Sequence, residues 1–147
     1  MERNLLTTKY AGQYRYGHNI EEERIGYLQI YPESDSTVLF YIDLNRGAPS
    51  YNMGSLYGRV KIVYDSGTFI TKFDTLGKGC ELLFHFFRSK IEINTINNRD
   101  DCYFGYGVYA DGNFKKESNK INEYFENAEG KKIYFKKTKP EDYYKDN

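Results

Sequence analysis

Short segments in which apolar and polar residues alternate recur along most of this chain, and this alternation is the feature that most restricts its fold. In residues 37–45 (TVLFYIDLN), Val38, Phe40 and Ile42 fall on one face of an extended strand. Turn residues separate such segments, which lie at 10–17, 26–31, 37–45, 55–64, 68–73, 80–87, 90–95, 102–110, 114–117 and 132–137. Strands joined by short turns pair antiparallel. The sequence therefore predicts an all-β fold.

The number of these segments predicts either an antiparallel up-and-down barrel or a barrel-like sandwich of about eight strands. The chain has 147 residues, which is typical of one domain, and its 16 Tyr and 10 Phe suit pleated, half-buried strands. Gly58 and Gly105 fall inside expected strands, where glycine permits the sharp bends that barrel closure requires. This favours the barrel over the sandwich.

We expect one domain over residues 1–147, with a change of pattern near its end. Ile121, Tyr124 and Phe125 have helical spacing, so the sequence predicts one short helix over residues 118–130. A polar tail follows at residues 138–147, where Pro140 is expected to begin a helical turn.

The alternating faces also predict which side chains form the core. The inward set is expected to be Leu28, Ile30, Phe40, Ile42, Val60, Ile62, Leu82, Phe84, Phe86, Ile91, Ile93, Phe104 and Val108.

The charge balance argues against a nucleic-acid partner. Lys plus Arg and Asp plus Glu both number 21, whereas proteins that bind nucleic acids normally carry a basic surplus. The first residues, MERNLLTTKYAG, contain no apolar stretch long enough for a signal peptide, and no apolar run reaches the ~20 residues that span a bilayer. Two interpretations remain: a cytoplasmic protein, or a mature domain whose leader has been removed.

The chain has two cysteines, Cys80 and Cys102, each placed at the start of an expected strand. We expect them to form a disulfide, which for a loop of this size contributes roughly 3 kcal/mol and is typical of oxidising compartments. The alternatives are two buried free thiols or half of a metal site. No CxxC pair is present and His18 and His85 stand apart, so no metal and no cofactor are predicted.

The stretch DDCYFGYGVYADGNFKK (residues 100–116) alternates aromatic residues with glycines. It predicts a curved barrel strand over residues 102–110, followed by a hairpin at Asp111-Gly112. Two interpretations of the glycines are open: a barrel bend, or the floor of a ligand groove between Tyr103 and Tyr109.

Candidate binding residues lie in loops, because no catalytic motif is present and the chain is predicted not to be an enzyme. The loop at residues 46–54 (RGAPSYNMG) offers Tyr51, Asn52 and Met53 as an aromatic, an amide and a soft apolar group. The alternative interpretation is an ordinary turn.

The segments GQYRY, GCELLFHFF and CYFGYGVYADGNFKK together resemble small secreted β-barrel proteins of bacteria, including periplasmic lysozyme inhibitors. Those families carry a Ser-Gly-rich inhibitory loop with a nearby tyrosine, and Tyr64-Asp65-Ser66-Gly67 is the comparable segment here, which adds Ser66 to the candidates. The resemblance implies a periplasmic or secreted protein, with or without a lipid anchor, that has no enzymatic activity.

Two functions are thus expected from the sequence. The first is a non-enzymatic extracytoplasmic domain that binds a protein, such as a lysozyme or a toxin, as an inhibitor or immunity protein. The alternative is a lipocalin-like carrier of a small apolar ligand, which predicts an interior void lined by Phe and Leu.

Overall fold

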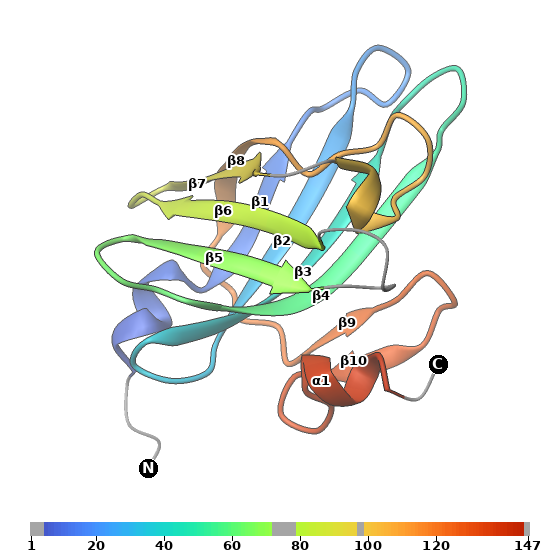
Figure 1. Cartoon of the computed structure of the whole chain (residues 1–147). Helices are drawn as coiled ribbons and strands as arrows, with labels where there is room; N and C mark the ends of the chain where they lie inside the picture. Colours follow the sequence, from blue (N-terminus) through green and yellow to red (C-terminus); the bar gives the residue numbers. More distant parts are fainter. Residues whose placement is uncertain (1–4, 72–78, 97–98, 146–147) are drawn as a thin grey trace.

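The computed structural model describes residues 5–71, 79–96 and 99–145 (Figure 1). Eight strands form one sheet in the order β4-β3-β2-β1-β8-β7-β6-β5, and every neighbouring pair is antiparallel. The strands are β1 (Gly12–Tyr16), β2 (Ile25–Pro32), β3 (Thr37–Asn45), β4 (Met53–Lys61), β5 (Ser66–Thr71), β6 (Cys80–Phe86), β7 (Lys90–Thr95) and β8 (Gly112–Ser118). The predicted all-β, eight-stranded antiparallel barrel is confirmed.

β1 pairs with β2 on one side and with β8 on the other, which joins the first four and the last four strands into one continuous sheet. The two ends of the sheet, β4 and β5, are consecutive in the chain and meet at a tight turn. Tyr64 and Asp65 have φ of 50° and 65° in that turn, and a single bridge joins Val63 to Ser66. The barrel is therefore nearly closed, with a seam between β4 and β5.

Aromatic rings fill the interior of the barrel. The ring centroids of Phe40 and Phe84 lie 4.8 Å apart, and those of Phe40 and Phe69 lie 5.2 Å apart. Gly58 is required opposite these rings, since a Cβ there would lie only 2.4 Å from Phe69 Cε1. The predicted inward residues all belong to this core, although Ile62 and Phe104 pack at its margin and are only partly buried.

A second, smaller layer covers the outer face of β3 and β4 (Figure 1). It consists of a hairpin of β9 (Tyr124–Glu126) and β10 (Lys132–Tyr134), followed by α1 (Pro140–Tyr143). Its apolar cluster contains Leu39, Tyr41, Tyr57, Phe125, Ile133 and Phe135. Consequently both faces of β3 are buried, and the outer face of that strand is not solvated.

The prediction of a helix over residues 118–130 is wrong. These residues hold the end of β8, the strand β9 and a turn that carries Gly130 at φ 79°. Phe125 is 1% exposed and stacks on Tyr41 with ring centroids 3.9 Å apart. Packing of one aromatic ring onto a distant strand thus outweighs a weak helical spacing. The helical turn expected at Pro140 is confirmed as α1.

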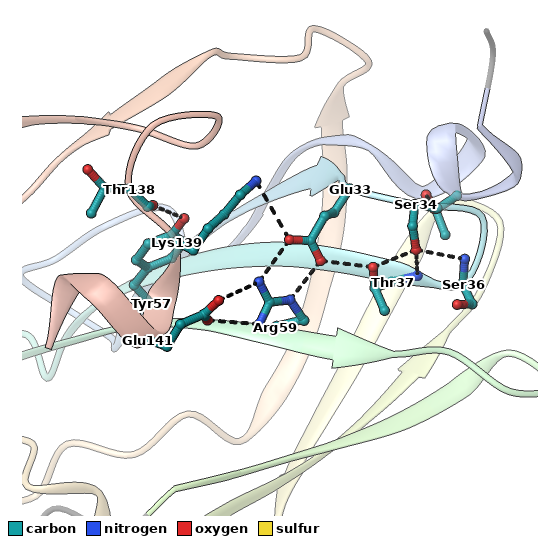
Figure 2. A network of polar contacts seen from close by, with 10 residues as sticks. Glu33, Ser34, Ser36, Thr37, Tyr57, Arg59, Thr138, Lys139 and Glu141 are labelled. Atoms are coloured by element: carbon teal, nitrogen blue, oxygen red, sulfur yellow. Dashed lines mark hydrogen bonds and ion pairs between the residues drawn. The ribbon is translucent and has the colours of Figure 1, made fainter. Parts of the chain in front are cut away.

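A polar network fastens α1 to the barrel (Figure 2). Arg59 on β4 forms two hydrogen bonds to Glu33, of 2.7 and 2.9 Å, and two to Glu141, of 2.8 and 3.2 Å. The hydroxyl of Tyr57 donates to the carbonyl oxygen of Thr138 at 2.7 Å. Bidentate pairing of one guanidinium with two carboxylates gives this contact a defined geometry.

The expected strand over residues 102–110 is also absent. The chain there forms the 3-10 helix η2 (Arg99–Cys102) and then an irregular segment up to Asp111. Tyr103 and Gly107 have φ of 55° and 75°, which lie outside the β region of a regular strand. Asp111-Gly112 is not a hairpin turn: Gly112 begins β8, and Asp111 accepts hydrogen bonds from Thr95. Another 3-10 helix, η1 (Leu6–Tyr10), precedes β1.

Candidate functional site

Two segments that lie far apart in the sequence meet at one end of the barrel. They are the loop between β3 and β4 (residues 46–52) and the segment between η2 and β8 (residues 103–111). The main-chain amide of Gly105 donates to the carbonyl oxygen of Met53 at 2.9 Å, and the Asn52 side-chain amide donates to the carbonyl oxygen of Tyr106 at 2.8 Å. We call the exposed side chains of Tyr51, Met53, Tyr103 and Tyr106 the loop face.

The loop of residues 46–52 is held by its own hydrogen bonds. The Arg46 amide donates to the carbonyl oxygen of Asn52 at 2.8 Å, and the Tyr51 amide donates to that of Gly47 at 3.0 Å. The Ala48-Pro49 peptide bond is cis. Tyr51 has φ of 54°, an uncommon conformation for a residue with a bulky side chain. The loop therefore presents Tyr51 and Met53 from a defined backbone.

The segment of residues 103–111 is anchored at both ends. Cys102 is bonded to Cys80 by the predicted disulfide, which is confirmed with Cα atoms 4.5 Å apart. Val108 and Ala110 are buried in the barrel core. Between these anchors the side chain of Tyr106 is left 85% exposed.

Arg24 fixes the far end of that segment. Its guanidinium carbon lies 4.0 Å from the ring centroid of Tyr109 and 4.9 Å from that of Tyr16. The same side chain donates to the carbonyl oxygen of Asp111 at 3.1 Å. Tyr109 thus has a packing role and is only partly exposed, in contrast to Tyr103.

The loop face is apolar and aromatic at its centre with charged groups around it. Tyr103 is 57% exposed, Met53 55% and Tyr51 38%. The Tyr51 hydroxyl donates to Glu21 at 2.6 Å, and this hydrogen bond raises the pKa of Tyr51 above its ordinary value. The guanidinium carbon of Arg46 lies 5.8 Å from the ring centroid of Tyr106.

Sequence reasoning placed Tyr51, Asn52, Met53, Tyr103 and Tyr109 among the candidates, and the structure brings all five to this end of the barrel. Sequence reasoning missed Tyr106, because a continuous strand over residues 102–110 would turn that side chain inward. Glycine on both sides of a tyrosine, as in Gly105-Tyr106-Gly107, is the one local signal that favours an exposed loop.

Ser66 does not belong to the loop face. It begins β5, at the end of the barrel where the β4–β5 turn lies, and pairs with His85. In that turn Tyr64 is 96% exposed and Asp65 accepts a hydrogen bond of 2.7 Å from the Tyr10 hydroxyl. The segment that resembles an inhibitory loop is thus a second exposed tip, separated from the loop face by the length of β4.

Among the described residues, no group of three His, Cys, Asp or Glu side chains is placed to hold a metal ion. No helix in the described ranges is long and apolar enough to cross a membrane. Comparison of the chain with protein-family models, curated proteins and solved structures finds no match.

Proposed function

We propose that this chain is a non-enzymatic, extracytoplasmic domain that binds another protein through the loop face. The observation that carries the proposal is the exposure of Tyr51, Met53, Tyr103 and Tyr106 on two loops that hydrogen bonds join to each other. Tyrosine, methionine and arginine are enriched at the centres of protein interfaces, and Tyr is among the residues that dominate binding energy.

Preorganisation supports the same proposal. Binding surfaces gain affinity when their loops are already ordered in the free protein, because less conformational entropy is lost on association. Here a disulfide, buried Val108 and the hydrogen bond from Gly105 to Met53 hold the loops. Tyrosine adds large contact area with few rotatable bonds.

The filled interior favours a protein partner over the alternative, a lipocalin-like carrier. Phe40, Phe84 and Phe114 are 0% exposed and lie inside the barrel, where a carrier would need space for its ligand. A small apolar ligand would therefore have to displace these core side chains.

The partner that we propose, from the resemblance to periplasmic inhibitors, is a lysozyme or a toxin of similar size. The disulfide is compatible with a periplasmic or secreted location, because such bonds persist in oxidising compartments. Inhibition then amounts to covering the partner's substrate cleft with a rigid, aromatic surface.

The test is a cell-wall lysis assay with a panel of purified lysozymes, combined with titration calorimetry on any lysozyme that the full chain inhibits. We expect Tyr106→Ala and Tyr103→Ala each to weaken binding by about tenfold or more, which is about 1.4 kcal/mol. Tyr64→Ala is the matched control, since it removes a tyrosine that is still more exposed than Tyr106 from the opposite end of the barrel.

Two results would contradict the proposal. Absence of inhibition across the panel would remove lysozyme as the partner. Loss of binding in Tyr64→Ala with unchanged binding in Tyr106→Ala would move the contact from the loop face to the β4–β5 turn.

A further inference from the structure

Three cations from neighbouring strands lie in one line on the outer face of the sheet. Arg15 on β1 is paired in register with Lys115 on β8, and Lys115 is paired with Lys90 on β7. The residues that precede Arg15 and Lys115, Tyr14 and Phe114, are buried in the barrel core, as is the residue that follows Lys90. Alternation along each strand therefore turns the three cations outward. We call Arg15, Lys115 and Lys90 the cation row.

The cation row lies on a part of the sheet that is open to solvent. The second layer of β9, β10 and α1 packs on β3 and β4 and, among the described residues, leaves the outer face of β1, β8 and β7 uncovered (Figure 1). Lys115 is exposed, and Arg15 and Lys90 are partly exposed. The chain after β8 crosses this face beside the row, where the Gln13 side-chain amide donates to the carbonyl oxygen of Lys120 at 3.2 Å.

The row is unfavourable for the sheet itself. Like charges directly opposite each other on neighbouring strands destabilise a sheet, because they repel at short distance. In the described part of the chain, no ion pair joins a member of the row to a carboxylate. Glu92 and Glu117, each two positions from a row cation on its strand, form no such pair. A ligand that carries negative charge would offset this repulsion.

Aromatic rings hold both ends of the row. The Arg15 guanidinium carbon lies 5.3 Å from the ring centroid of Tyr27, its register partner on β2. The Lys90 ammonium nitrogen lies 4.8 Å from the ring centroid of Phe87, whose amide donates to the Lys90 carbonyl oxygen at 2.9 Å. A cation–π contact fixes the position of a cation without cancelling its charge. The charge of the row thus remains available to an anion from outside.

The groups on and beside the row define the chemistry of a ligand. Neighbouring strands lie about 4.8 Å apart, so the main chain of the row spans about 10 Å and suits negative charges repeated along a linear molecule. The side-chain amides of Gln13 and Asn113 lie on the same face, two positions from the row, and can hydrogen-bond to hydroxyl groups. Tyr27 and Phe87 are exposed, and their rings offer flat apolar surfaces to the C–H groups of sugar rings. Negative charges, hydroxyl groups and sugar C–H groups occur together in acidic polysaccharides.

We propose that the cation row binds an acidic polysaccharide, with Arg15, Lys115 and Lys90 pairing with successive sulfate or carboxylate groups of one chain. Guanidinium and ammonium groups form charge-assisted hydrogen bonds with such oxyanions, and these are stronger than hydrogen bonds between neutral groups. The ligand lies across the strands, along the row, with sugar rings against Tyr27 and Phe87 at its ends. The formal net charge of the chain is zero, but the local potential of the row attracts anions.

The test is titration calorimetry of the full chain with heparin, polygalacturonate, neutral dextran and poly-L-glutamate of matched length. We expect heparin and polygalacturonate to bind and dextran not to bind. Binding should be lost at 1 M salt, where the Debye length falls to about 3 Å. Polygalacturonate and poly-L-glutamate both carry carboxylates, so their comparison separates a polysaccharide from an acidic protein surface.

The variants Lys115→Gln and Lys90→Gln each remove one charge of the row and keep a polar side chain. We expect each to weaken heparin binding about tenfold, as for one lost charge-assisted hydrogen bond. Lys132→Gln is the matched control, because Lys132 on β10 also lies over a ring, 5.0 Å from the centroid of Tyr124, but belongs to the second layer. Its affinity for heparin should stay within about twofold. Without ligand, Lys115→Gln should raise the urea midpoint, since it removes two pairs of opposed like charges.

Several results would overturn the proposal. Heparin and polygalacturonate might both fail to bind, or Lys132→Gln could weaken binding as much as Lys115→Gln does. Poly-L-glutamate that binds as tightly as polygalacturonate would replace the polysaccharide by an acidic protein surface. A lower urea midpoint in Lys115→Gln would show that the row stabilises the fold. This site is separate from the loop face, so Tyr106→Ala should leave heparin binding unchanged, and failure of one proposal is distinguished from failure of the other.

Discussion

Removal of the disulfide by Cys80→Ala/Cys102→Ala is expected to cost a large share of the stability of this chain. The sequence separation is 22, for which the chain-entropy model gives about 11 cal/mol/K, or about 3 kcal/mol at 25 °C. Both cysteines are buried, at 0% and 4% exposure, so the lost sulfur packing adds about 1 kcal/mol. The sum is about 4 kcal/mol, against a total of ~5–15 kcal/mol for a domain.

The assay is urea unfolding at equilibrium, followed by far-UV circular dichroism, of the oxidised native chain and the double variant without reductant. The midpoint should fall by roughly 1.3–4 M urea, because the slope is typically ~1–3 kcal/mol/M. The oxidised chain should show no reactive thiol after denaturation without reduction.

Order in the loop face provides a second readout. The disulfide is the covalent anchor of residues 103–111, and the hydrogen bond from the Gly105 amide to Met53 depends on that anchor. In the double variant the Gly105 amide should therefore show faster hydrogen exchange. A stability loss below ~1 kcal/mol, or two reactive thiols in the denatured and unreduced chain, would refute the reasoning.

Two further predictions concern the core and the α1 network. Phe84→Ala should lower the free energy of unfolding by ~3–5 kcal/mol in the same urea assay, because Phe84 is 0% exposed and lies between the rings of Phe40 and Phe86. A decrease below ~1 kcal/mol would contradict the assignment of Phe84 to the core. Burial alone would raise the pKa of Glu33, but the hydrogen bonds from Arg59 and Thr37 outweigh burial and hold that pKa below 4.5. The hydrogen bond from Arg59 also lowers the pKa of Glu141. The stability that these carboxylates contribute is therefore present above pH 4.5 and is lost as the pH falls through their lowered pKa values in the folded state. Arg59→Gln should accordingly make the unfolding midpoint less dependent on pH below 4.5. An unchanged pH dependence in that range would contradict this reasoning.

The strand faces could be predicted from the sequence because the signal is local. A period of two residues assigns each side chain to one face of a strand without any knowledge of its neighbours. Val38, Phe40 and Ile42 are accordingly buried in the barrel core as expected. The disulfide could be predicted for a similar reason, since the chain has only two cysteines and few alternatives to their pairing exist.

The interpretation of residues 102–130 depended on contacts that no local pattern encodes. Tyr103 to Tyr109 have the composition of a strand, yet Gly105 bonds to Met53, which lies 105 − 53 = 52 positions earlier in the sequence, and Tyr103 takes a left-handed conformation. Phe125 has helical spacing with its neighbours, yet it stacks on Tyr41 of β3. In both segments a long-range contact outweighs a propensity difference of less than ~1 kcal/mol per residue.

The sequence by itself therefore determined the fold class and the inward faces of the strands of this protein, and it predicted the disulfide that the structure confirms. The tertiary structure alone decided which tyrosines are exposed, because Tyr106 points outward only when residues 103–111 leave the sheet. It also decided where the barrel stays open. Apolar and polar residues alternate in the same way in a strand paired on both sides and in an edge strand. Only the order of the strands in the sheet therefore shows that no ladder of main-chain hydrogen bonds joins β4 to β5.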